Sequence, residues 1–165
     1  MQLLPPWQTA GLRISLVLRI LTVSCAVALI GCAGKPGADP ELDAARLHRE
    51  LVTLDSHLDT PAWLSVSGWQ IEARHSVVDD GSQVDVPRMI EGGLDGGFWA
   101  TYLPQGPLTP EGRAAALQAA LVRIGEIRAM VEAQPDRFAL ALEASDAARI
   151  AASGRHFVFL SMENG

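Results

Sequence analysis

Cysteine is scarce in this chain: 165 residues contain two, Cys25 and Cys32. Both lie in or at the edge of an N-terminal segment that has the features of a removable signal. No cysteine follows Cys32, so a disulfide within the mature domain is excluded. The hydrophobic content of 48% suits one domain with a substantial apolar core.

A hydrophobic run long enough to span a membrane is also missing. The apolar run at 20–30 has roughly 11 residues, whereas a spanning helix needs about 20. Extending the run toward residue 14 would bury Arg19, which is costly in a bilayer. With Arg13 and Arg19 in front of or beside the run, residues 1–32 are predicted to be a signal peptide.

The end of this segment carries a candidate lipidation site. Residues 29–32 (Leu-Ile-Gly-Cys) resemble the bacterial lipobox, which implies that Cys32 is acylated and becomes the first mature residue. Several acyl chains on one residue would anchor the protein stably in a membrane. The alternative is an ordinary signal peptide with an incidental Cys32.

The residues after Cys32 suggest a lipoprotein of the cell envelope. Residues 33–41 are rich in glycine and proline and are predicted to form a flexible tether to a domain at 42–165. Ala33 follows the cysteine in place of the aspartate that retains lipoproteins in the inner membrane. A periplasm-facing protein anchored in the outer membrane is therefore the preferred expectation.

Positive charge is in short supply. Thirteen basic residues face 19 acidic ones, for a formal net charge of −6. An acidic balance disfavours nucleic acid and anionic lipid as binding partners, because both are negatively charged.

A glycine-rich phosphate motif is absent as well. The glycines between 92 and 97 precede a predicted strand, whereas a dinucleotide-binding motif follows one. They are interpreted as a tight helix-to-strand connection, with a close backbone approach to a ligand as the alternative.

The apolar pattern predicts alternating strands and helices. Strands are expected at 52–58, 97–103, 138–141 and 157–162, and helices at 41–50, 86–91, 109–133 and 145–152. An irregular loop or hairpin is expected between the first strand and the helix at 86–91, whose N-cap is Asp85 or Val84. The long helix should carry one apolar stripe, and the last strand should be buried. This alternation predicts an α/β fold with right-handed crossovers and a parallel sheet.

Three potential metal ligands follow two of these strands. His57 and Asp59 end the first strand, where residues two apart point the same way, and an imidazole with a carboxylate suits zinc. Glu163 ends the last strand. Because the carboxyl ends of parallel strands share one rim, the three side chains are expected to meet there.

Three blocks of the sequence resemble the membrane (renal-type) dipeptidase family, peptidase family M19. They are residues 55–61 (Asp-Ser-His-Leu-Asp-Thr-Pro), 84–104 (Val-Asp-Val-Pro to Tyr-Leu-Pro) and 162–165 (Met-Glu-Asn-Gly). The resemblance implies a metal-dependent hydrolase fold, with this chain forming the N-terminal part of a TIM-type (β/α)8 barrel. It also implies that the parent protein hydrolyses dipeptides with zinc.

The same resemblance implies a role for each ligand. His57 and Asp59 would bind the first of two Zn²⁺ ions, and Glu163 would bridge both. Asp55 is a candidate supporting partner of His57. The family's two further histidines on the second zinc, its substrate-facing histidine and its catalytic aspartate find no match here, so no catalytic residue is assigned. His156 begins the last strand, at the opposite rim.

Two readings of the activity remain. One is a zinc dipeptidase of which this chain is an N-terminal fragment that is inactive alone; the other is a non-catalytic metal- or peptide-binding lipoprotein. Trp99 and Tyr102 are expected to pack in the core, with a place in the substrate cleft as the alternative. Asn164 stands where many relatives carry glycine. The oligomeric state is not predicted.

Overall fold

The computed structural model describes residues 40–164, and burial of side chains is described from Asp43 onward. The predicted signal peptide at 1–32, Cys32 and the tether up to residue 39 lie outside the described residues. The first helix begins at Pro40, one residue before the expected start at 41. All interactions discussed below lie within one compact unit, Ala45–Gly165.

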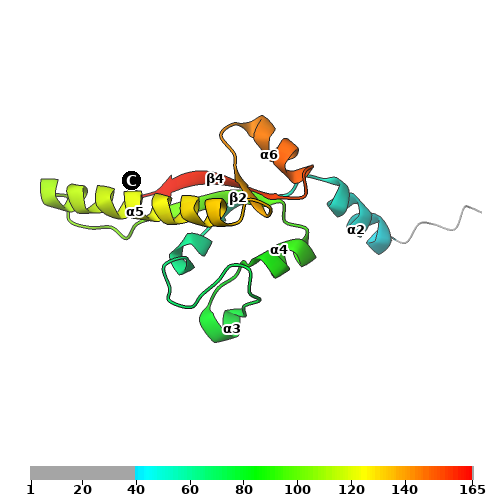
Figure 1. Ribbon diagram of the computed structural model, residues 1–165, viewed down its shortest axis with the longest axis horizontal. Coiled ribbons are helices and arrows are strands. Elements are labelled where there is room, and N and C mark those ends of the chain that lie inside the picture. The colour runs from blue at the N-terminus through cyan, green and yellow to red at the C-terminus, as the bar shows by residue number, and fades with distance from the viewer. Residues whose placement is uncertain (1–39, 165) are drawn as a thin grey trace, which may run out of the picture. The chain divides into compact units, whose positions relative to one another are not determined.

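The described residues form four strands and five α-helices, with one 3-10 turn (Figure 1). The strands are β1 (Leu54–Leu58), β2 (Gly96–Tyr102), β3 (Phe138–Leu140) and β4 (His156–Glu163). The helical elements are α2 (Pro40–Glu50), η1 (Thr60–Trp63), α3 (Val77–Asp80), α4 (Val86–Gly92), α5 (Pro110–Ala133) and α6 (Ala144–Ala151). Each predicted strand and helix is confirmed to within about two residues, the usual uncertainty of element ends. None of the described helices is both long and apolar enough to cross a membrane.

All strand pairs are parallel, and the strand order is β1-β2-β4-β3. From β2 the chain crosses over β4 to form β3, and from β3 it runs back to form β4. Because these two connections run in opposite directions, right-handed crossovers put α5 and α6 on opposite faces of the sheet. Two apolar clusters agree with this. Val158 of β4 belongs to the cluster that includes Ile127 of α5, whereas its neighbour Phe157 packs with Ile150 of α6. The predicted α/β class with a parallel sheet is confirmed.

Local sequence signals explain the helix that precedes β2. Asp85 is the N-cap of α4, and its side chain accepts the backbone N–H of Arg88. Gly93 ends the helix in the left-handed region at φ 64°, which favours glycine. Further on, a Cβ atom on Gly96 would lie 2.3 Å from the Phe157 carbonyl oxygen. The glycine-rich segment is thus a tight connection packed between strands, as the first interpretation held.

The segment between η1 and α4 contains the short helix α3 and no strand, so the hairpin alternative is wrong. Two neighbouring acidic residues and a serine N-cap account for α3: Ser76 accepts the N–H of Val78, and Gly81 closes the helix at φ 78°. This segment lies beside the carboxyl end of β1.

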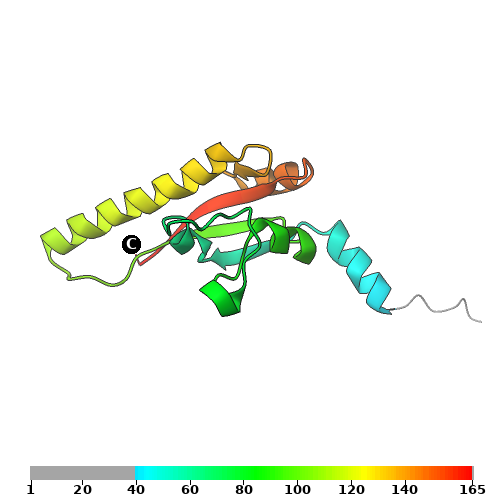
Figure 2. The same ribbon diagram turned by 60° about the horizontal axis from the view of Figure 1, so that its bottom comes forward.

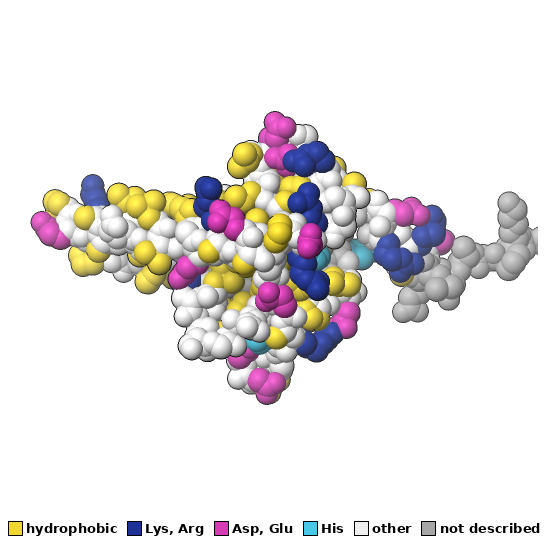
Figure 3. All heavy atoms as spheres, viewed as in Figure 1, with side chains coloured by type: hydrophobic (Ala, Val, Ile, Leu, Met, Phe, Trp, Pro, Cys, Tyr) yellow, Lys and Arg dark blue, Asp and Glu magenta, His cyan; other side chains and the backbone are white. Residues whose placement is uncertain are grey.

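The predicted burial of β4 is wrong in part, and the apolar stripe predicted for α5 is not fully covered. The apolar stripe of α5 is covered only in part: Ala120, Ile127 and Met130 are buried, while Leu117 and Leu121 are 58% and 53% exposed. The first turns of α5 extend beyond the strand ends (Figure 2), and apolar side chains gather there on the surface (Figure 3). In β4, Met162 is 54% exposed. Periodicity reports an apolar face, but only the packing of other elements decides whether that face is covered.

Candidate metal centre

His57 lies on an irregular stretch of β1. The pairing of β1 with β2 shifts register between Asp55 and Leu58, which is the mark of a β-bulge. Leu58 is buried in the core, whereas the side chain of His57 is 44% exposed. The Asp55 carboxylate accepts the backbone N–H of His57 at 2.8 Å, so it supports the histidine through the main chain and not through the imidazole ring.

Asp59 occupies the position before η1, and the turn that follows it is anchored firmly. Thr60 and Pro61 are buried. Arg123 of α5 donates to the Pro61 carbonyl oxygen and also contacts Glu126 at 2.8 Å. A helix more than 60 residues away in sequence thus fixes the backbone that carries Asp59.

Glu163 is the last residue of β4 and lies beside Tyr102 in the β2–β4 register. The next residue, Asn164, has a positive φ of 59°, and its side-chain amide donates to the Leu103 carbonyl oxygen at 2.9 Å. Asparagine tolerates the left-handed region better than other residues with a side chain. Asn164 therefore adopts the left-handed backbone at the end of β4 without a glycine.

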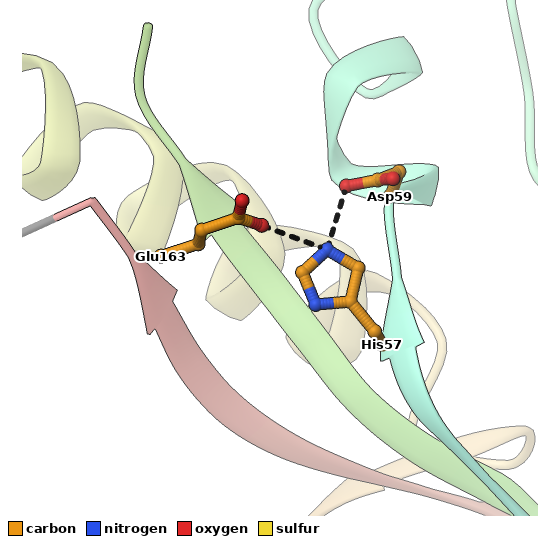
Figure 4. Close-up of side chains that lie close together, drawn as sticks. All are labelled: His57, Asp59 and Glu163. Atoms are coloured by element: carbon orange, nitrogen blue, oxygen red, sulfur yellow. Dashed lines mark hydrogen bonds and ion pairs between the residues drawn. The ribbon is translucent and has the colours of Figure 1, made fainter. Parts of the chain in front are cut away.

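The structure brings the three predicted ligands together (Figure 4). The Nε2 atom of His57 lies 3.2 Å from an oxygen of Asp59 and 3.0 Å from an oxygen of Glu163. The three ligand atoms lie within 4.8 Å of one another. The side chains are 44%, 65% and 49% exposed in the order His57, Asp59, Glu163, so the cluster is open to solvent.

This donor set fits a dication. One N–H bond on Nε2 can point at only one of the two carboxylate oxygens, whereas a cation among the three atoms contacts all of them. Ligand atoms at about 2.0–2.2 Å from a tetrahedral zinc lie about 3.4 Å apart. The observed separations of 3.0 and 3.2 Å are therefore close to those of a three-ligand site.

The other histidines serve the fold, and none lies in the cluster. His156 begins β4, and its Nδ1 donates to the Leu94 carbonyl oxygen at 3.0 Å. Burial lowers its pKa, although this hydrogen bond and the charge of Asp95 act in the opposite direction. His48 donates to the Gly92 carbonyl oxygen at 2.8 Å, and His75 stacks on Trp69.

A cavity of about 200 Å³ lies beside the cluster. One side is formed by the end of β1 and the start of η1, and the other by the segment that follows α3. The lining residues are Asp55, His57, Leu58, Asp59, Thr60, Trp63, Gly81, Ser82, Gln83 and Val84. From the sequence, residues 81–83 are expected to be irregular without a role, and Val84 only opens the block at 84–104 that resembles the family. Their position after a strand was the available signal, because loops at the carboxyl ends of strands build the sites of parallel barrels.

The two aromatic candidates, Trp99 and Tyr102, differ in burial. Trp99 is fully buried and stands edge-on to Phe138 at a centroid distance of 5.7 Å, so it is a core residue. Tyr102 is 50% exposed at the carboxyl end of β2, so the expected core packing of Tyr102 is wrong.

Comparison with solved structures identifies proteins of the same fold. The probable dipeptidase PvdM from Pseudomonas aeruginosa is 24% identical, with a TM-score of 0.61 over 73% of this chain and 30% of its own. Dipeptidase AC, a metallopeptidase of family M19, is 26% identical, with a TM-score of 0.54 over 67% of this chain and 36% of its own.

A third structure is a metallopeptidase from Rhodobacter sphaeroides bound to a phosphinate mimic of the dipeptide L-Ala-D-Ala. It is 24% identical, with a TM-score of 0.52 over 67% of this chain and 37% of its own. This chain thus spans about a third of the length of the solved structures that it matches. Its four parallel strands correspond to part of their TIM-type barrel, as predicted.

No curated protein matched the chain. The sequence model of the membrane dipeptidases, peptidase family M19, matches residues 42–165, which is the whole predicted domain and most of the chain. Together with the shared fold, this match shows that the chain belongs to the membrane dipeptidase family.

Proposed function

We propose that this chain supplies the first part of a zinc site, and that the parent protein hydrolyses small dipeptides. The observation that carries the proposal is the convergence of His57, Asp59 and Glu163 within 4.8 Å at the carboxyl edge of the sheet. Dipeptides are proposed as substrates because one relative of the same fold was solved with a dipeptide mimic.

The roles proposed for the three residues follow from their chemistry. His57 offers one neutral nitrogen and Asp59 one carboxylate oxygen to the first metal position. Glu163 has two carboxylate oxygens, which suits the proposed bridge between two Zn²⁺ ions. When bound, zinc polarises a carbonyl oxygen and lowers the pKa of a coordinated water to about 7.

The surrounding chain holds these groups in place. The hydrogen bond from the His57 N–H to Asp55 fixes one ligand, the contact of Arg123 with Pro61 fixes the turn after the second, and Asn164 fixes the strand end after the third. A site held by three separate elements loses little freedom when a metal binds, which favours affinity.

Zinc affinity, measured by competition with a chromogenic chelator, tests the proposal. We expect binding by the wild-type chain and at least about 10-fold weaker binding by Asp59→Asn and Glu163→Gln, which keep side-chain size and remove a negative charge. Asp136→Asn, a change of an exposed aspartate outside the cluster, is the control. Equal affinity of all four proteins would contradict the proposed site.

Hydrolysis is tested separately, with L-Ala-D-Ala and zinc. For the 165 residues alone we expect no turnover above a metal-only blank, because the proposed second-metal ligands are not matched in this sequence. Activity is expected in a longer gene product that carries two further histidines and a late aspartate. A longer product that binds zinc and the dipeptide without turnover would support the non-catalytic binding protein instead.

Membrane attachment is a further part of the proposal and is supported by the sequence alone. Acylation of Cys32 would place the protein in the cell envelope, with the outer membrane preferred. Membrane fractionation of the wild type and Cys32→Ser tests this. A Cys32→Ser protein that stays with the membrane would contradict it.

A further inference from the structure

The cavity beside the metal cluster has a wall that faces His57 and Asp59 across the opening. We call residues 81–84 the wall segment; they contribute Gly81, Ser82, Gln83 and Val84 to the lining. Its position matters because a ligand held by the cluster would extend into this cavity.

The wall segment is held by the guanidinium of Arg88, on α4. Nη1 of Arg88 donates to the Ser82 carbonyl oxygen at 3.0 Å, and Nη2 donates to the Ser82 hydroxyl oxygen at 3.2 Å. Nε donates to the Asp85 carboxylate at 2.6 Å. Ser82 is only 2% exposed, so these contacts are largely shielded from water. The planar fork of arginine makes all three at once, which lysine cannot do.

Asp85 fixes that guanidinium from a fully buried position. Its carboxylate also accepts the backbone N–H of His75 and of Arg88, each at 2.8 Å. Burial by itself would raise the pKa of Asp85, but these hydrogen bonds and the charge of Arg88 together hold the pKa below its ordinary value. The Asp85–Arg88 pair is therefore charged and satisfied at neutral pH.

The wall segment is held from its other end as well. Asp80 accepts the Ser82 N–H at 2.8 Å and contacts the His75 ring at 2.7 Å. The indole N–H of Trp63 donates to the Asp80 carbonyl oxygen at 3.3 Å. The backbone of Ser82 is thus tied through both its N–H and its carbonyl group.

Gln83 differs from its neighbours, since it is exposed and lines the cavity. Within residues 43–164, the structure assigns its side-chain amide no hydrogen-bond partner. A fixed backbone therefore carries an exposed amide, with two donors and one acceptor, at the lining of the cavity that His57 and Asp59 also line.

We propose that Gln83 contacts the dipeptide and that Arg88 and Asp85 are positioning residues that hold Gln83 at the cavity. The inference rests on the proposed function and assigns a recognition role to a segment outside the metal ligands. The amide hydrogen-bonds a polar group of the dipeptide backbone, and the wall segment limits the size of the residue bound beside the metal. A cavity of about 200 Å³ is smaller than the 300–1,000 Å³ of typical drug-sized sites, which suits a small residue.

The test measures the affinity of the zinc-loaded chain for L-Ala-D-Ala by calorimetry, together with zinc affinity. Gln83→Ala is the primary variant, because an exposed side chain can be removed without loss of folding. We expect it to bind the dipeptide about 3- to 10-fold more weakly, the worth of about one hydrogen bond, with zinc affinity unchanged. Arg88→Met should weaken dipeptide binding by at most about as much as Gln83→Ala, with Arg88→Lys between Arg88→Met and the wild type.

Arg74→Met is the matched control. Arg74 forms an ion pair with Glu91, which lies on α4 like Arg88, but this ion pair is at the surface. Hydrogen exchange adds a second readout: the amides of the wall segment should exchange faster in Arg88→Met and at the wild-type rate in Gln83→Ala and Arg74→Met. Wild-type dipeptide affinity in Gln83→Ala would overturn the inference, and so would a zinc-loaded wild type that binds no dipeptide. A wild type that binds no zinc would instead overturn the proposed function on which the inference rests.

Discussion

Each end of the sheet carries a histidine, and the two differ in almost every respect. His57, at the carboxyl end, is 44% exposed, with two carboxylate oxygens within 3.2 Å. His156, at the amino end, donates to a backbone carbonyl oxygen and lies against Phe138. The comparison teaches that residue type alone does not identify a ligand. The end of the strand at which a histidine lies is more informative. Loops and polar groups gather at the carboxyl ends of parallel strands, whereas His156 at the amino end packs against core residues.

The largest effect is expected from the core near the amino end. Phe157 is fully buried and packs with Ile150 of α6. We expect Phe157→Ala to lower the free energy of unfolding by about 3–5 kcal/mol, because it removes a large buried side chain and leaves a cavity. Urea denaturation measures this. A loss below about 1 kcal/mol would show that this end of the sheet is not the stabilising one.

The two histidines are compared directly by the same substitution at each. His57→Gln is expected to weaken zinc binding at least about 100-fold, equivalent to about 2.7 kcal/mol, with the free energy of unfolding within about 0.5 kcal/mol of the wild type. His156→Gln should leave zinc affinity unchanged. Chelator competition and urea denaturation of both variants measure this. Weaker zinc binding in His156→Gln would break the comparison.

The pH dependence of stability should arise at the amino end. The pKa of His156 is lowered by burial, so the ring is neutral in the folded chain at a pH where the unfolded chain is already protonated. Stability is therefore fully present above the ordinary pKa of 6.5 and falls as the pH is lowered toward the folded pKa. The slope is at most about 1.4 kcal/mol per pH unit.

Urea denaturation at pH 7.5 and 5.5 tests this sign. The wild type should lose stability on acidification, and His156→Gln should lose less, because glutamine does not titrate. An identical loss in both proteins would assign the pH dependence to other groups.

The smallest effect is expected at the carboxyl end, at Asn164. Asn164→Ala removes the hydrogen bond to Leu103 and places an alanine at positive φ, which costs about 1 kcal/mol. Asn164→Gly keeps the permitted backbone and should be closer to the wild type. Thermal denaturation ranks the three proteins. Equal stability of the two variants would mean that the backbone conformation at Asn164 contributes nothing.

Much of the fold was predictable because its signals are local. Asp85 and Thr109 mark helix starts by accepting backbone N–H groups three residues on, and Gly93 marks a helix end. Alternating apolar segments predicted a parallel sheet. The strand order β1-β2-β4-β3 was not predictable in this way, since pairing depends on contacts between segments far apart in sequence.

The candidate site was predictable in part. The position of His57, Asp59 and Glu163 at strand ends predicted that they meet, and they do. The role of Asp55 was only half predicted, because a bulge sends its carboxylate to the main chain. The wall segment was missed: its position after a strand was a signal, but no residue type within 81–84 shows that these residues lie beside the end of β1.

The sequence by itself determined the types of candidate ligand, their strand ends and the family to which the chain belongs. Only the tertiary structure decided that α5 leaves Leu117 uncovered, that β1 bulges before His57, and that Arg88 holds a second wall of the cavity. The physical reason is the range of the interactions. Propensity, capping and strand alternation act over a few residues, whereas burial and hydrogen bonding across a cavity depend on where the rest of the chain packs.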